Sequence, residues 1–117
     1  MTNNYSCDQK KWCFDFLNYE FKDESLLTLA FTHRSASSKN NERLEFLGDA
    51  ILGFIIADLL FHIKINVSEG DLTRLRARLV QESTLYEIAT KIKLSNLIAL
   101  GSGEKKSGVR NLSLIHI

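Results

Sequence analysis

Apolar side chains recur along most of the chain at the spacing of amphipathic helices, with positions three and four residues apart falling on one face. No stretch of useful length alternates with a period of two, and the sequence contains no proline. The predicted fold class is therefore all-α. The pattern places helices at residues 7–17, 23–31, 42–63, 71–81 and 83–93.

The longest of these segments, 42–63, is apolar on nearly all sides beyond Asp49, which predicts the central buried helix of the domain. Its apolar run, from Ala50 to Phe61 and interrupted by Asp58, is predicted to be too short to span a bilayer. Polar loops are expected at Ser35–Asn40 and Gly101–Gly108.

Three carboxylates, those of Glu42, Glu45 and Asp49, share one stripe at the start of this helix. Like charges at this spacing repel one another, so a cation is expected to offset them, and Mg²⁺ prefers such oxygen ligands. The alternative is structural, because acidic residues stabilise the first turns of any helix and nearby arginines could pair with them. Spacing alone leaves both open. The candidate arginines are Arg43, Arg74 and Arg78.

Three further features have a structural and a functional interpretation. Ser68-Glu69-Gly70-Asp71 reads as a capping box that begins a helix. Phe46, between Glu45 and Leu47, fits an ordinary helix packing face. A group of basic residues forms either nucleic-acid-binding patches or a solvated surface: Arg74, Arg76, Arg78, Lys105, Lys106 and Arg110.

The composition indicates a single small unit. The chain has 117 residues, of which 44% are hydrophobic, enough for one core. Its formal net charge of +1 provides no strong overall field for nucleic acid. Cys7 and Cys13 form no C-x-x-C pair and are expected to be reduced and buried. Residues 1–5 do not read as a secretion signal, so the expected location is the cytoplasm.

The ten residues from Asn41 to Ala50 (NERLEFLGDA) resemble the signature of the ribonuclease III family without a mismatch. The flanking segments agree in order with the same family, and the resemblance runs from about residue 17 to residue 108. Those segments are Phe31-Thr32-His33-Arg34-Ser35, Glu69–Val80 and Gly101–Gly108.

This resemblance implies a helical endonuclease domain that forms a homodimer and hydrolyses double-stranded RNA with Mg²⁺, or alternatively Mn²⁺, in rRNA and mRNA processing. No organic cofactor and no membrane partner are implied. Glu45 and Asp49 match the catalytic, metal-binding carboxylates, and Phe46 matches a residue of the dimer interface. Residues that match RNA-binding or cluster-supporting positions are Glu42, Glu69, Arg74, Arg78, Lys105 and Lys106.

The chain departs from the family's pattern after Gly108, where the expected Asp-x-x-Glu-Ala motif does not appear. We therefore expect residues 1–117 to be a single partial catalytic domain, incomplete at its C-terminus and without a double-stranded-RNA-binding domain. Two carboxylates should bind Mg²⁺ more weakly than four, so this polypeptide is predicted to be inactive by itself. Apolar surface left exposed on the signature helix is expected to drive association. The alternative function is a non-catalytic scaffold for dimerisation or ribosome association.

Overall fold

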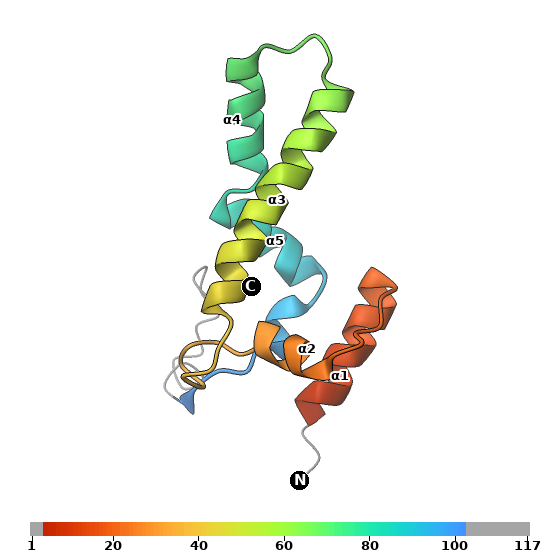
Figure 1. Ribbon diagram of the computed structural model, residues 1–117, viewed down its shortest axis with the longest axis vertical. Coiled ribbons are helices and arrows are strands. Elements are labelled where there is room, and N and C mark those ends of the chain that lie inside the picture. The colour runs from red at the N-terminus through yellow and green to blue at the C-terminus, as the bar shows by residue number, and fades with distance from the viewer. Residues whose placement is uncertain (1–3, 103–117) are drawn as a thin grey trace.

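The computed structural model describes residues 4–102, with side chains from residue 7 onward. Within that range the chain is helical and contains no strand, which confirms the all-α prediction (Figure 1). Five α-helices and two short helices follow one another: α1 Asn4–Trp12, the π-helix η1 Cys13–Leu17, α2 Glu24–Ala30, α3 Glu42–Ile63, α4 Glu69–Leu79, α5 Glu82–Lys91 and the 3₁₀-helix η2 Leu94–Leu97.

Local signals in the sequence set several of these helix ends. Asp23 begins α2, because its Oδ1 accepts hydrogen bonds from the backbone N–H (2.9 Å) and the hydroxyl of Ser25. Asn18 ends η1 in the left-handed region, with φ of 49°, and its N–H donates to the carbonyl of Phe14 at 3.1 Å. The predicted bounds of the signature helix, 42–63, are those observed for α3.

The hydrophobic core of the described chain lies among α1, η1, α2 and η2, away from α3. Trp12 packs on this core and contacts Phe31 edge-on, with ring centroids 6.0 Å apart. Segments from the two ends of the described chain therefore build one core. Its buried members are Cys13, Leu27, Phe31, Leu97, Ile98 and Leu100.

Two side chains of α1 fasten this core with long-range hydrogen bonds. The buried Gln9 donates from Nε2 to the carbonyl of Leu97 at 2.9 Å. Trp12 donates from Nε1 to the carbonyl of Ile92 at 2.6 Å. Ile92 is the C-cap of α5, and Leu97 is the last residue of η2, so these two bonds hold the end of α5 and η2 against α1.

A short backbone junction connects this core to the start of α3. An isolated parallel bridge pairs Thr32 with Ala99. Its hydrogen bonds run from the N–H of Ala99 to the carbonyl of Phe31 (2.8 Å) and from the N–H of His33 to the carbonyl of Ala99 (3.0 Å). The N–H of Asn41 then donates to the carbonyl of Thr32 at 3.0 Å. The segment 31–33 therefore contacts both the end of the described chain and the start of α3.

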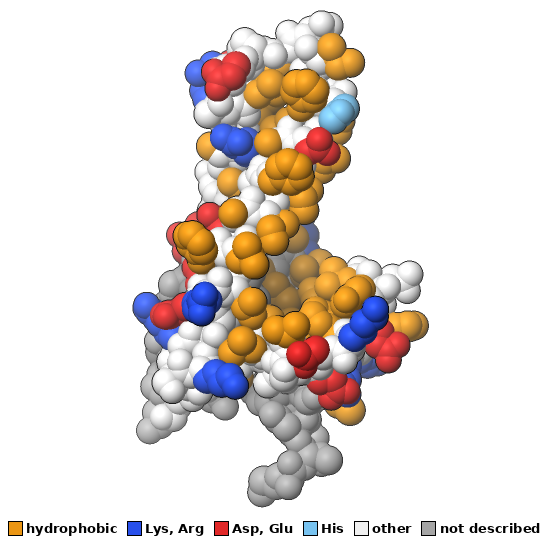
Figure 2. All heavy atoms as spheres, in the orientation of Figure 1, with side chains coloured by type: hydrophobic (Ala, Val, Ile, Leu, Met, Phe, Trp, Pro, Cys, Tyr) orange, Lys and Arg blue, Asp and Glu red, His pale blue; other side chains and the backbone are white. Residues whose placement is uncertain are grey.

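The prediction that the signature helix is buried at the centre of the domain is wrong for the described chain. Leu60 is the one buried residue of α3, which packs mainly against α4 to form a protruding hairpin (Figure 1). Apolar side chains line much of the rest of α3 (Figure 2). The apolar sequence of α3 predicted that other elements pack on it, but no described element packs on this part of its surface. Its exposed large side chains are Phe46, Leu47, Ile51, Phe54, Ile55, Leu59, Phe61 and Ile63.

Two smaller expectations also need correction. By length and composition α3 qualifies as a candidate membrane span, contrary to the prediction that its apolar run is too short, although the core helix of a soluble protein meets the same criteria. Both cysteines are free, but Cys13 alone is buried and Cys7 is exposed. Burial raises the pKa of the Cys13 thiol by penalising the thiolate.

Candidate active site

Two consecutive asparagines position the first turn of α3. Asn40 Oδ1 accepts a hydrogen bond from the N–H of Glu42 at 3.0 Å and so satisfies one of the free donors at the helix start. Asn41 is only 4% exposed, and its Nδ2 donates to the carbonyl of Ala30 at 3.0 Å. Its own carbonyl accepts the N–H of Glu45 at 2.8 Å. The start of α3 is thereby anchored to the end of α2.

The predicted metal-binding pair follows directly on this anchor. Glu45 lies in the first turns of α3 and is half-buried, while Glu42 and Asp49 are exposed. Glu45 and Asp49 are four residues apart, so they lie one helical turn from each other on the same side of α3. Residues 4–102 contain no group of three or more carboxylate, histidine or cysteine side chains arranged to hold a metal ion. The described donor set is therefore a pair.

For Glu42 and Asp49, the described ion pairs give no support to the alternative in which arginines neutralise the acidic stripe. Arg74 pairs with Asp71 of its own helix. Neither Glu42 nor Asp49 forms an ion pair with any residue in the range 4–102. The carboxylate of Asp49 is thus available to solvent and to a cation.

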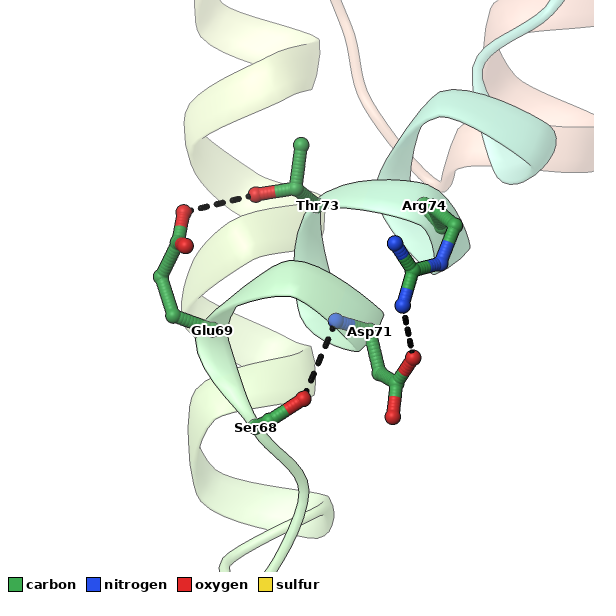
Figure 3. A network of polar contacts seen from close by, with 5 residues as sticks. All are labelled: Ser68, Glu69, Asp71, Thr73 and Arg74. Carbon is green, nitrogen blue, oxygen red and sulfur yellow. Dashed lines mark hydrogen bonds and ion pairs between the residues drawn. The ribbon is translucent and has the colours of Figure 1, made fainter.

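The second acidic segment serves as the start of α4 (Figure 3). Ser68 Oγ accepts a hydrogen bond from the N–H of Asp71 at 3.3 Å, which is the N-cap that the sequence predicts. Glu69 Oε1 accepts the hydroxyl of Thr73 at 2.9 Å, and Asp71 pairs with Arg74. Both acids therefore have structural partners within their own helix.

The basic residues predicted to contact RNA differ in whether their side chains already have a partner. The Arg74 guanidinium is tied to Asp71 and lies 3.7 Å from where a Cβ of Gly70 would be. Arg78 is exposed, and its backbone carbonyl accepts the hydroxyl of Thr84 at 2.9 Å. Lys105 and Lys106 lie outside the described residues.

Phe46 does not belong to the core, and the interpretation of this residue as ordinary helix packing is wrong. Its side chain is 82% exposed, although it lies beside the half-buried Glu45. It lines an open depression of about 950 Å³ at the start of α3, together with the basic residues Lys39 and Arg43 and the apolar Leu29.

Reasoning from the sequence missed the structural role of Asn41 and the contacts of His33 and Ser35. Asn41 stands first in the signature, but its spacing gives no sign that it is buried. His33 and Ser35 lie two residues apart, and their side chains meet only because residues 32–36 turn. The one available signal was the position of Asn41, a polar residue directly before the apolar segment 42–63.

Comparison with known proteins supplies the assignment that geometry leaves open. The family model described as Ribonuclease-III-like matches residues 23–116. The chain belongs to the ribonuclease III family. Ribonuclease 3 of Vibrio vulnificus is 56% identical to it over 92 residues, and ribonuclease 3 of Shewanella sediminis is 60% identical over 92 residues. These segments cover 79% of this chain and 41% of either relative, so the chain spans about two fifths of their length.

Solved structures agree with the fold. The nuclease domain of ribonuclease III from Campylobacter jejuni superposes with a TM-score of 0.84 at 42% sequence identity, covering 91% of this chain and 76% of that domain. A second structure of the same domain gives a TM-score of 0.80 at 41% identity, covering 99% and 76%. The described helices are therefore those of a ribonuclease III nuclease domain, and the named relatives are endoribonucleases.

Proposed function

We propose that this chain provides the first metal-binding pair of an endonuclease that hydrolyses double-stranded RNA, with Glu45 and Asp49 as the ligands. The observation that carries the proposal is the placement of these two acids one turn apart on α3, within a helix start fixed by Asn41. Phosphodiester hydrolysis requires no side-chain nucleophile when a bound cation polarises the phosphoryl oxygen and lowers the pKa of a water molecule.

The donor set suits Mg²⁺ better than a softer metal. Mg²⁺ takes oxygen ligands and commonly uses one or two carboxylates while keeping several waters, and Mn²⁺ accepts the same donors. The half-buried Glu45 and the exposed Asp49 provide such a pair with an open, solvated side. Because two carboxylates hold the ion weakly, we propose that the 117-residue chain by itself cleaves RNA poorly or not at all.

Arg78, with Lys105 and Lys106, would contribute phosphate contacts, and Glu42 would support the metal-binding pair. Glu69 and Arg74 are assigned no part in it, because Glu69 lies beside Ala57, Leu60 and Phe61 and Arg74 pairs with Asp71. Of Arg74 and Arg78, Arg78 is the stronger candidate for a phosphate contact, because the guanidinium of Arg74 already pairs with Asp71. Contacts of basic side chains with phosphate weaken as salt rises, so RNA affinity should fall steeply with ionic strength.

We further propose that the chain associates as a homodimer through the apolar face of α3. Eight large apolar side chains on this helix are each about half exposed or more, with Phe46 at 82% and Phe54 at 72%. Contiguous apolar surface on this scale is unusual for a monomer and is typical of association sites. In the Campylobacter jejuni protein, a structurally flexible region is involved in dimer formation of the nuclease domain.

The decisive experiment replaces the matching 92 residues of Vibrio vulnificus ribonuclease 3 with the corresponding residues of this chain. We expect the chimera to cut a long RNA duplex in the presence of Mg²⁺, and expect Glu45→Ala with Asp49→Ala to abolish cutting. The matched control is Asp58→Ala, an acid of the same helix on the opposite side from Asp49, which should leave cutting intact.

The chain alone should be assayed beside the chimera. Cutting by the 117-residue chain that disappears in the double variant would contradict the proposal that the chain is inactive alone. A folded chimera that binds duplex RNA but does not cut it would instead favour the non-catalytic scaffold, for which the exposed face of α3 is the supporting observation.

A further inference from the structure

A cavity of about 440 Å³ is lined by residues of α1, η1, the loop 18–23 and α2. Its volume lies in the range of small-molecule sites, which is about 300–1,000 Å³. Cys13 and Leu27, each 2% exposed, line its inner side and belong to the hydrophobic core. Neither Glu45 nor Asp49 lines it, so the cavity is separate from the proposed metal-binding pair.

The backbone beside the cavity has an unusual conformation. α1 continues directly into the π-helix η1, a rare form of helix that is frequent at functional sites. η1 ends at Asn18 in the left-handed region, and the next N–H, that of Tyr19, donates to the carbonyl of Cys13 at 3.3 Å. After this turn, residues 19–21 line the cavity together with α2.

Three aromatic side chains line the cavity. Tyr19 and Phe21 meet edge to face, with ring centroids 5.0 Å apart. Phe14 is 63% exposed and Tyr19 is 51% exposed, so both present ring surface that the core does not use. Aromatic rings attract cations through their quadrupole, and they also pack against the apolar part of an organic molecule.

The charged side chains around the cavity leave one carboxylate without a partner. Lys10 pairs with Glu24 and so joins α1 to α2, and Lys11 pairs with Asp15 at 3.4 Å. Glu20 is the remaining charged residue of the lining, and it forms no hydrogen bond or ion pair within residues 4–102. The pKa of Lys10 is raised chiefly by Glu24 and more weakly by Glu20, so the charge of Glu20 acts across this part of the surface.

We propose that this cavity binds a free organic ammonium ion, with its apolar body against Phe14, Tyr19 and Phe21 and its cationic group beside the carboxylate of Glu20. Lys10 and Lys11 already have acidic partners, so they offer little to an anion. A neutral apolar molecule would gain nothing from the carboxylate, and one free carboxylate is too few for a firmly held metal ion. The site is independent of the proposed RNA cleavage.

The probe is phenethylammonium, added to the ¹⁵N-labelled 117-residue chain at pH 7 while the amide signals of residues 19–21 are followed by NMR. The comparison compounds are 2-phenylethanol, which is neutral, and 3-phenylpropionate, which is an anion. We expect phenethylammonium to bind about three- to tenfold more tightly than 2-phenylethanol, and the anion to bind most weakly. Equal affinities of the three compounds in the wild-type chain would overturn the proposal without need of any variant.

Glu20→Gln removes the negative charge and keeps the size of the side chain. It should weaken binding of phenethylammonium by about three- to tenfold and leave binding of 2-phenylethanol unchanged. The matched control is Glu87→Gln, at an exposed residue of α5 that does not line the cavity, which should change neither affinity. Undiminished binding of phenethylammonium to Glu20→Gln would refute the role of this carboxylate.

Two further observations test where the probe binds and what it represents. If the amides of residues 51–55 on the exposed face of α3 respond with the same affinity as those of residues 19–21, the binding is nonspecific and the proposal fails. Nα-acetyl-lysine amide carries the same ammonium group on a peptide backbone. Tighter binding of this compound than of phenethylammonium would assign the cavity to a lysine side chain of a protein and overturn the proposal of a free small molecule.

Discussion

The side-chain amide of Asn41 donates a hydrogen bond to the backbone carbonyl of Ala30, with an Nδ2 to O distance of 3.0 Å. Ala30 is the last residue of α2, and Asn41 immediately precedes α3. One buried side chain therefore joins two helices across a loop of polar residues, and it does so one turn before the proposed metal ligand Glu45. This contact fixes the position of Glu45 and Asp49 relative to the core, because few other residues of α3 are buried against the described chain.

Replacing Asn41 with alanine should destabilise the fold by about 1–3 kcal/mol, since it leaves the partly buried carbonyl of Ala30 without its partner. Urea denaturation followed by circular dichroism measures this loss. Asn66→Ala, at an exposed asparagine after α3, is the matched control and should change stability by less than about 0.5 kcal/mol. Equal effects of the two substitutions would contradict the anchoring role.

Removing the carboxylate of Asp49 should abolish specific binding of a divalent cation at the start of α3. Mn²⁺ added to the ¹⁵N-labelled chain should broaden the amide signals of residues 45–49, and Asp49→Asn should remove this broadening. Asp58→Asn, on the opposite side of the same helix, should leave it unchanged. Broadening that survives Asp49→Asn would place the cation elsewhere.

Phe46→Ser should weaken self-association, because it removes the most exposed aromatic side chain of the α3 face. Sedimentation velocity over a range of protein concentrations would show the shift toward monomer. Phe14→Ser is the control, because Phe14 is 63% exposed but belongs to η1. If both substitutions reduce association to the same degree, the interaction is nonspecific and does not use the α3 face.

Ser68→Ala should cost about 1 kcal/mol of stability by removing the N-cap of α4. The midpoint of urea denaturation should fall accordingly. Ser83→Ala is the comparison, because Ser83 lies exposed in the first turn of α5 and makes no described side-chain hydrogen bond. An unchanged midpoint in Ser68→Ala would show that this cap contributes nothing to stability.

The cap at Asp23 should make stability depend on pH in acid. Hydrogen bonds from the side chain and backbone of Ser25 lower the pKa of Asp23 from its ordinary value of 3.8. A lowered folded-state pKa means that this contribution is fully present above pH 3.8 and is lost as the pH falls through the folded value. The difference in denaturation midpoint between the wild type and Asp23→Ala should therefore be constant above that pH and shrink below it.

The control for this prediction is Asp8→Ala, at an exposed residue of α1 without a described ion pair. Its midpoint difference from the wild type should stay small throughout the titration. If the difference in denaturation midpoint for Asp23→Ala stays constant down to about pH 2, the hydrogen bonds from Ser25 do not stabilise the Asp23 carboxylate in the folded protein.

The sequence by itself determined the helices, because caps and apolar spacing act over a few residues. It predicted α3 at 42–63 with the observed bounds, and it read Ser68–Asp71 as a capping box, although α4 spans Glu69–Leu79 and not the predicted 71–81. The signature around Glu45 and Asp49 also gave the family, since ten consecutive matching residues are specific in a way that spacing is not. All of this information lies within single segments of the chain.

Only the tertiary structure decided where these segments lie relative to one another. The burial of α3 was predicted wrongly because an apolar helix shows that it needs partners, whereas its exposure depends on which elements are present to cover it. The role of Phe46 changed from core to surface for the same reason. The contacts of Asn41 with Ala30 and of Ser35 with Gly101 join residues 11 and 66 positions apart, and such contacts exist only once the chain has folded.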